Sequence, residues 1–216
     1  MNWQRSLMPV IGLALWISAV GAGMGVLYKY SVTPGVAGTP GAQWPNASSI
    51  PFAAAPFTLV MVIHPHCPCS RASIGELAIL MAHSGGKLAA DVVFVEPPGL
   101  GERWTKTDLW SSAGTIPGVR RIIDRGGEAK LFGAATSGQT MVYDRNGRLR
   151  FSGGITLARG HYGDNDGVSA ILATLGAPSK GNRDEPITNR TTTEVYGCPL
   201  FAPSSTRNIE QRTCRK

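Results

Sequence analysis

Two histidines and two cysteines lie within six residues, in the run His64-Pro65-His66-Cys67-Pro68-Cys69. Thiolates attack disulfides and bind soft metal ions, and imidazoles bind copper and zinc. Only one residue separates Cys67 from Cys69, and such a tight pair is unsuited to an ordinary structural disulfide. The run therefore predicts a reactive or metal-binding site.

The segments on either side of this run predict its surroundings. Phe57 to Ile63 reads FTLVMVI, a continuous β-prone apolar run, which predicts a strand covered on both faces. From Arg71 onward apolar residues recur at helical spacing, and Gly85-Gly86 ends the pattern. Cys67 is thus placed at a strand-to-helix turn, where unpaired N–H groups and the helix dipole favour a thiolate.

The rest of the middle region predicts a mixed sheet flanked by helices. An Asn-Gly turn at Asn146-Gly147 indicates a hairpin. Strands that first alternate with helices and then form a hairpin before a last helix are typical of a compact α/β sandwich. The predicted strands are 91–95, one within 116–124, 140–143 and 149–152, and the predicted helices are 103–110, 128–132 and 168–175.

An uncharged apolar stretch at the N-terminus predicts a membrane anchor. Leu7 to Leu27 carries no charge and is bounded by Arg5 and Lys29. It is long enough to cross a bilayer, and it exceeds the apolar core of a signal peptide. We expect residues 1–30 to stay as an uncleaved signal-anchor of a single-pass protein whose bulk is extracytoplasmic. Cleavage near Ala19-Val20-Gly21 is the alternative.

Composition divides the remaining chain into three parts. Residues 31–56 contain five prolines and no charge, which predicts a partly extended Pro/Gly/Ala-rich linker. Residues 57–178 are predicted to form one folded domain. Residues 179–216 are a polar tail, with an apolar island at 195–201 that we expect to dock on the domain.

The net charge of +7 does not indicate a nucleic-acid-binding surface. Residues 57–178 carry 12 basic and 10 acidic side chains, and the basic residues do not gather with aromatic residues. A protein that binds nucleic acid concentrates Lys and Arg on one face or arm. Nucleic acid is therefore excluded as a predicted partner.

Two stretches resemble the thioredoxin-like superfamily. These are HCPCSRASIGEL after an apolar strand and TSGQTMVYDRNGRLRFSGG before a final helix, and the chain is most similar to membrane-tethered RedB-type thioredoxin-like proteins. The resemblance implies a thioredoxin-like sandwich and a periplasmic thiol-disulfide oxidoreductase. It also implies a disulfide- or thiol-bearing protein substrate and no cofactor.

The resemblance assigns roles within the cysteine stretch. Aligned with the CPPCRAEMPEL-type stretch of tethered thioredoxin-like proteins, Cys67 matches the attacking cysteine, Pro68 the following proline and Arg71 the arginine. Ser70 stands where the resolving cysteine belongs, so Cys69 is predicted to resolve through a C-x-C disulfide. Alternatively, Cys69 is a spectator and Cys67 works alone with Ser70 beside it. From the residues alone, Arg71 and Glu76 are interpreted as solvated helix charges.

The resemblance also concerns the loop opposite the cysteines. Family members place a cis-proline before the strand that opens the hairpin, and here Gln139 followed by Thr140 occupies that place. A cis peptide before a non-proline residue costs about 3 kcal/mol. We therefore expect a trans peptide, with Gln139 as a polar neighbour of Cys67.

The two remaining cysteines leave three readings open, the last of which is that both stay free thiols. Cys198 and Cys214 would close a loop of about 17 residues as a disulfide that contributes roughly 3 kcal/mol. Alternatively, Cys198 docks near Cys67 and supplies the missing resolving thiol. The sequence does not choose between them, although the disulfide is the favoured reading.

A metal site is the rival function. His64, His66, Cys67 and Cys69 are suitable ligands for Cu(I) or Zn(II), and thioredoxin-like copper-delivery proteins are known. On this reading the protein is a metallochaperone, with His161 as the distant candidate ligand. A thioredoxin-like fold that is retained without catalysis is the third reading.

Overall fold

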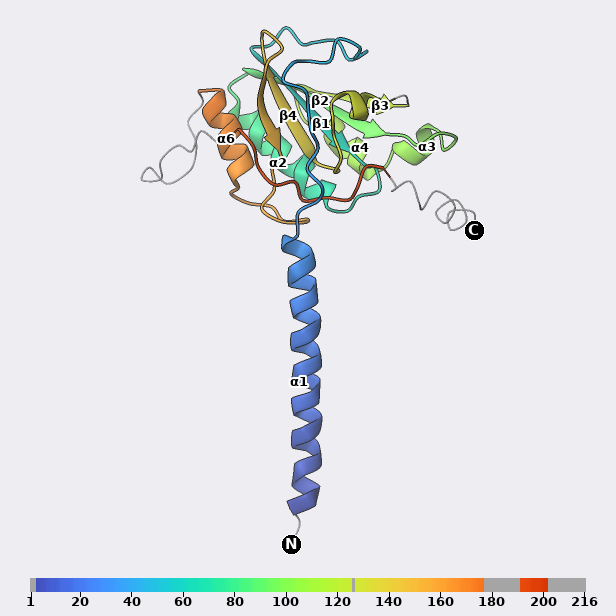
Figure 1. The fold of residues 1–216 in the computed structure, drawn as a ribbon, viewed down its shortest axis with the longest axis vertical. Helices are drawn as coiled ribbons and strands as arrows, with labels where there is room; N and C mark the ends of the chain where they lie inside the picture. Colours follow the sequence, from blue (N-terminus) through green and yellow to red (C-terminus); the bar gives the residue numbers. More distant parts are fainter. Residues whose placement is uncertain (1–2, 126, 177–190, 202–216) are drawn as a thin grey trace. The chain divides into compact units, whose positions relative to one another are not determined.

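The computed structural model describes residues 3–125, 127–176 and 191–201, and the chain divides into two compact units between Thr33 and Pro34. The first unit is helix α1 (Trp3–Val32) (Figure 1). Its stretch Pro9–Val32 is long and apolar enough to cross a membrane, and its side chains are exposed. The predicted N-terminal apolar helix is confirmed.

The second unit is built on a five-stranded mixed sheet in the order β3-β2-β1-β4-β5. Strands β1, β2 and β3 run parallel, whereas β4 is antiparallel to both β1 and β5. The strands are β1 (Phe57–Ile63), β2 (Leu88–Val95), β3 (Val119–Asp124), β4 (Gln139–Asp144) and β5 (Leu149–Gly153). The helices are α2 (Ser70–His83), α3 (Glu102–Thr105), α4 (Asp108–Gly114), α5 (Glu128–Leu131) and α6 (Asp166–Thr174).

Strand β1 is buried on both faces, as its continuous apolar sequence predicts. Leu59, Met61 and Ile63 belong to a core shared with α2 and α6, which cover the same side of the sheet (Figure 1). Val60 and Val62 belong to a second core on the other face. Alternate residues of a strand point to opposite faces, so both faces need an apolar cover. The predicted α/β sandwich is confirmed.

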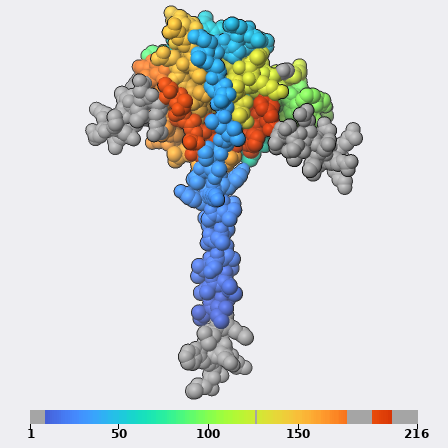
Figure 2. Space-filling model, viewed as in Figure 1, coloured from blue at the N-terminus to red at the C-terminus, as the bar shows by residue number. Residues whose placement is uncertain are grey.

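The second face is covered partly by residues 34–56, which the sequence predicts as a linker. The Trp44 ring lies 4.9 Å from the rings of Phe52 and Phe132, and Ile50 is buried in the same core. In Figure 2 this blue segment crosses the domain beside the red segment 191–201, and the Gly35 amide donates to the Val195 carbonyl at 2.7 Å. Residues 34–56 lack helix and strand but are packed on the domain, because Trp44 and Ile50 find cover in this core.

The strand ends bring the cysteine turn against the start of β4. Val62 pairs with Gln139, and the Gly138 amide donates to the Val62 carbonyl at 2.8 Å. Residues 64–69 and 136–139 therefore meet at one edge of the sheet. At the other end of α2, Gly85 and Gly86 have φ angles of 59° and 75°, which end the helix as predicted.

Candidate active site

The turn between β1 and α2 directs two thiols inward. The Cys67 amide donates to the His64 carbonyl at 3.0 Å, and the Ser70 amide donates to the Cys67 carbonyl at 3.1 Å. These bonds tighten the turn, so that Cys67 is 1% exposed and Cys69 is 7% exposed. Pro68 lies exposed between them, where its missing N–H leaves no buried donor unpaired.

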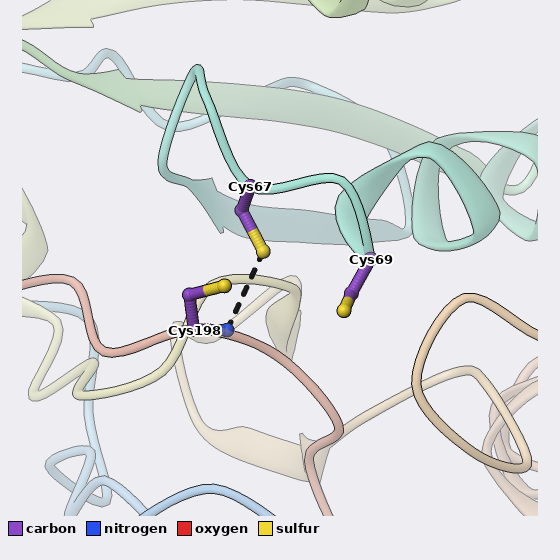
Figure 3. A group of neighbouring side chains, drawn as sticks. All are labelled: Cys67, Cys69 and Cys198. Carbon is purple, nitrogen blue, oxygen red and sulfur yellow. Dashed lines mark hydrogen bonds between the residues drawn. The ribbon is translucent and has the colours of Figure 1, made fainter. Parts of the chain in front are cut away.

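A third thiol comes from the C-terminal segment. Its backbone is held by two bonds to the loop before β4: the Ser137 amide donates to the Cys198 carbonyl at 2.8 Å, and the Leu200 amide donates to the Ala135 carbonyl at 2.9 Å. The Cys198 amide in turn donates to Cys67 Sγ at 3.4 Å (Figure 3). The three sulfur atoms of Cys67, Cys69 and Cys198 lie within 4.8 Å of one another.

The three thiols differ in acidity. A hydrogen bond from the Cys198 thiol, assisted by Ser70 and by the Cys198 amide, lowers the pKa of Cys67 to about 4 against the opposing effect of burial. Burial and the charge of Cys67 raise the pKa of Cys69. The hydrogen bond to Cys67 and burial raise the pKa of Cys198. At neutral pH the arrangement favours one thiolate, on Cys67, and two thiols.

Two serines and an arginine support the cluster. The hydroxyls of Ser70 and Ser137 lie 2.7 Å apart, and the Ser137 hydroxyl accepts the His64 amide at 2.7 Å. The Arg159 guanidinium donates to the carbonyl of Gly197, the residue before Cys198. Ser137 and Arg159 were not predicted as site residues. Serine in TSGQT was the available signal for Ser137, whereas the position of Arg159 depends on a loop without regular structure.

The loop that carries Arg159 is fastened to α2 through a buried carboxylate. Glu76 is 2% exposed and accepts the Gly163 amide at 2.7 Å and the Asn165 side-chain amide at 3.4 Å. Asn165 also caps α6 by accepting the Val168 amide at 2.9 Å. The interpretation of Glu76 as a solvated charge is wrong, because this loop covers it.

The two histidines turn toward α3. His66 Nε2 lies 2.9 Å from the Trp104 carbonyl oxygen, and its ring centroid lies 4.6 Å from that of Trp104. His64 Nδ1 accepts the His66 amide at 3.2 Å. Among the described residues the compact group of candidate ligands contains the three cysteines and neither of these histidines. The predicted four-ligand set of two imidazoles and two thiols is not assembled.

The other predicted supporting residues have structural contacts. Gln139 is buried, and its Oε1 accepts the Ala135 amide at 3.1 Å, whereas Ser137 takes the polar position beside the cysteine turn. The peptide bond before Gln139 is trans, as predicted, since the described residues contain no cis peptide. The buried Thr140 hydroxyl donates to the Gly138 carbonyl at 3.1 Å. Arg71 is exposed and forms an ion pair with Asp108.

The structure places Cys198 beside Cys67, as the reading of Cys198 as a resolving thiol requires. The alternative partner, Cys214, lies outside the described residues. The disulfide between Cys198 and Cys214 therefore stays a prediction. The apolar island at 195–201 supplied the sequence signal for the position of Cys198, because Val195 and Leu200 are both buried against the domain.

A strand followed by a cysteine turn and a helix, with an antiparallel hairpin on the other side of that strand, decides the fold. The fold is thioredoxin-like. This confirms the predicted thioredoxin-like fold. The narrower resemblance of this thioredoxin-like protein to RedB-type proteins stays a prediction.

Comparisons with solved structures agree with a shared fold. A hypothetical protein, SMc02350, from Sinorhizobium meliloti 1021 is 20% identical, with a TM-score of 0.53 over 81% of this chain and 97% of that chain. An uncharacterized conserved protein from Geobacillus kaustophilus is 18% identical, with a TM-score of 0.52 over 80% and 94%. At these identities the likeness concerns the fold alone. No family model and no curated protein matches the sequence of this thioredoxin-like protein.

A thioredoxin of known surface location also matches more distantly. The pneumococcal exposed lipoprotein thioredoxin Etrx1 from Streptococcus pneumoniae strain TIGR4 is 18% identical, with a TM-score of 0.39 over 56% of this chain and 83% of that chain.

Proposed function

We propose that this protein is a membrane-anchored thiol-disulfide oxidoreductase that acts on the extracytoplasmic side, with Cys67 as the attacking thiol. The proposal rests on one observation: Cys67 Sγ lies at the turn before α2 and accepts the Cys198 amide, in a setting that lowers the pKa of Cys67 to about 4. A thiolate at neutral pH is the species that attacks a disulfide.

The first step forms a mixed disulfide. The Cys67 thiolate attacks one sulfur of a protein substrate, the substrate S–S bond breaks, and the second substrate sulfur leaves as a thiolate that takes a proton. Since Cys67 then carries no charge, the thiol of Cys198 loses the acceptor that held its proton. The main cause that raises the pKa of Cys198 is thereby removed.

The second step releases the substrate. The Cys198 thiolate attacks Cys67 Sγ, a Cys67–Cys198 disulfide forms, and the first substrate sulfur leaves as a thiolate. Two electrons pass from the cysteine pair to the substrate disulfide, and the reverse sequence oxidises a substrate dithiol. Resolution by Cys69, which the sequence predicts, would give a C-x-C disulfide with a small ring. Resolution by Cys198 and resolution by Cys69 are distinguished by which disulfide is found in the product.

Access to Cys67 is part of this proposal. With 1% of Cys67 exposed, a substrate reaches the sulfur only after the segment around Gly197-Cys198 moves aside. The contacts that hold this segment are a short row of backbone bonds and the bond from Arg159 to Gly197. Opening of a few such bonds is a local event that leaves the sheet intact.

Reduction of insulin by the full-length protein in detergent, recycled by dithiothreitol, tests the proposed exchange. Cys67→Ser should lower the rate at least about 100-fold, to the rate of dithiothreitol alone, because it removes the attacking thiolate. Cys214→Ser should keep the wild-type rate. Full activity in Cys67→Ser would contradict the proposal.

Protease added to spheroplasts tests the proposed location. A domain on the extracytoplasmic side is digested without lysis, while a cytoplasmic marker protein survives. Protection of the domain until the membrane is broken would overturn the extracytoplasmic part of the proposal. The exchange assay is performed on solubilised protein and is independent of this result.

A further inference from the structure

We infer that the reduced protein also binds one Cu(I) ion between the sulfur atoms of Cys67, Cys69 and Cys198. This site differs from the one that the sequence predicts, since it replaces two imidazoles by a third thiolate from the C-terminal segment. The inference depends on the three-sulfur cluster and does not depend on catalysis of disulfide exchange.

The spacing of the sulfur atoms is close to that of a three-coordinate metal site. All three lie within 4.8 Å of one another. With metal–sulfur bonds of about 2.3 Å, three thiolates arranged around one ion lie about 4 Å apart. Each sulfur atom therefore has to move by less than about 1 Å, a shift that rotation about a Cα–Cβ bond supplies.

The donor set favours Cu(I) over Zn(II). Three thiolates form a soft set, which suits Cu(I), whereas structural zinc sites take four ligands in a tetrahedron. A fourth ligand would have to come from the nearby imidazoles, but His66 Nε2 lies 2.9 Å from the Trp104 carbonyl and His64 Nδ1 accepts the His66 amide. One ring nitrogen of each histidine is thus already hydrogen-bonded, and neither histidine belongs to the compact ligand group among the described residues.

The surroundings suit a reduced monovalent ion. Cys67 and Cys69 are at most 7% exposed and Cys198 is half-buried, so water reaches the cluster mainly from the side of Cys198. The Cys198 amide points at Cys67 Sγ, and Arg159 is fastened to Gly197, next to the third ligand. These donors and this positive charge offset part of the negative charge that three thiolates would bring together.

Copper binding and disulfide formation exclude each other. A disulfide between any two of the three cysteines consumes two of the donors, and the remaining thiol alone is a poor copper site. Binding of Cu(I) is not itself a redox step: each thiol that coordinates as thiolate releases its proton, and the ion keeps its charge. The oxidation state of the cysteines thus decides whether the ion is held.

The test is an anaerobic titration of full-length protein in detergent with Cu(I), in competition with the chromogenic chelator bicinchoninate. Every protein in the titration carries Cys214→Ser, so that Cys67, Cys69 and Cys198 are the cysteines that remain. The reduced protein should withdraw one equivalent of Cu(I) per chain. Cys69→Ser and Cys198→Ser should each weaken binding at least about tenfold, while His66→Ala should bind as tightly as the protein with Cys214→Ser alone. Zn(II) in a matched competition should bind less tightly.

Three outcomes would overturn the inference. They are failure of the reduced protein to withdraw Cu(I), equal binding by the Cys198→Ser variant, and loss of binding in His66→Ala. Circular dichroism checks that each variant is folded, and protein oxidised to a disulfide supplies a test without substitution, since it should withdraw no Cu(I). Insulin reduction is measured on the same samples, so failure of copper binding and failure of exchange are seen separately.

Discussion

The Cys198 amide nitrogen lies 3.4 Å from Cys67 Sγ, although the two cysteines are 131 positions apart in the chain. This contact joins the turn at the start of α2 to the C-terminal segment. It stabilises a thiolate on Cys67 and brings a second thiol to it. The candidate active site is therefore completed by a segment that lies outside the five-stranded sheet.

The first prediction concerns the pH dependence of Cys67. Its pKa is lowered from 9.0 to about 4, so the thiolate is lost as the pH falls through about 4. Between pH 4 and pH 9 the Cys67 sulfur is protonated in the unfolded chain and deprotonated in the folded chain. Stability contributed by this group consequently rises with pH across the window from 4 to 9. Thiolate absorbance at 240 nm should titrate near pH 4 in the reduced protein and be missing in Cys67→Ser. A midpoint near 9 would contradict the assignment.

The second prediction concerns Ser70, which hydrogen-bonds Cys67. Ser70→Ala should raise the pKa of Cys67 by about one unit, because a hydrogen bond to a charged group contributes about 1.5–3 kcal/mol and one unit corresponds to about 1.4 kcal/mol. The same absorbance titration measures it. Ser111→Ala on α4, whose hydroxyl bonds Thr107, is the matched control. An equal effect of both substitutions would show that the Ser70 contact is immaterial.

The third prediction concerns access to Cys67. Arg159→Ala removes the bond to Gly197, so the segment that covers Cys67 should open more often. We expect iodoacetamide to modify Cys67 about three- to tenfold faster, since a bond of about 1 kcal/mol changes an opening equilibrium by roughly that factor. Peptide mass analysis follows the reaction. Arg145→Ala, in the exposed turn of the hairpin, should leave the rate unchanged. A slower reaction in Arg159→Ala would oppose the account.

The fourth prediction compares two charged residues of α2. Glu76→Ala leaves the amides of Gly163 and Asn165 without their acceptor and should lower the free energy of unfolding by about 2 kcal/mol. Arg71→Ala breaks an exposed ion pair with Asp108 and should lower the free energy of unfolding by much less, because solvent screens this pair. Urea unfolding of the full chain in detergent, followed by tryptophan fluorescence, measures both. Similar, small effects of the two substitutions would show that Glu76 is solvated.

The fifth prediction tests the packing of residues 34–56. A Cβ at Gly38 would meet the Gly133 carbonyl oxygen and the Gln139 side chain, so Gly38→Ala should destabilise the protein by about 1–3 kcal/mol. At Gly41 the nearest atom would be the Gln43 carbonyl oxygen at 3.5 Å, and Gly41→Ala should change stability by less than about 0.5 kcal/mol. Urea unfolding compares the two variants. Equal stabilities would indicate a free linker.

Local patterns predicted the central strand and helix well. The continuous apolar run predicted β1 at Phe57–Ile63 with the bounds that the structure has, and helical spacing followed by two glycines predicted α2 to within one residue at its start. The hairpin around Asn146-Gly147 is equally local, since Gly147 has a φ of 72° and its amide bonds Asp144. Each of these elements is decided by residues close together in the chain.

Contacts between distant segments could not be predicted in the same way. The uncharged, proline-rich composition of residues 34–56 gave no sign that Trp44 and Ile50 pack on the sheet. The orientation of His64 and His66 is decided by Trp104 on α3, and the burial of Glu76 by the loop before α6. The approach of Cys198 to Cys67 could not be predicted for the same reason, because sequence spacing says nothing about contacts between residues 131 positions apart.

The most direct measurement identifies the disulfide that forms during turnover. Reduced full-length protein in detergent is mixed with one equivalent of a protein disulfide, quenched with acid, alkylated and digested, and the linked peptides are identified by mass spectrometry. The account predicts a bond between the peptides that contain Cys67 and Cys198. A product linked only between Cys67 and Cys69, or Cys67 recovered as an unmodified thiol, would contradict it.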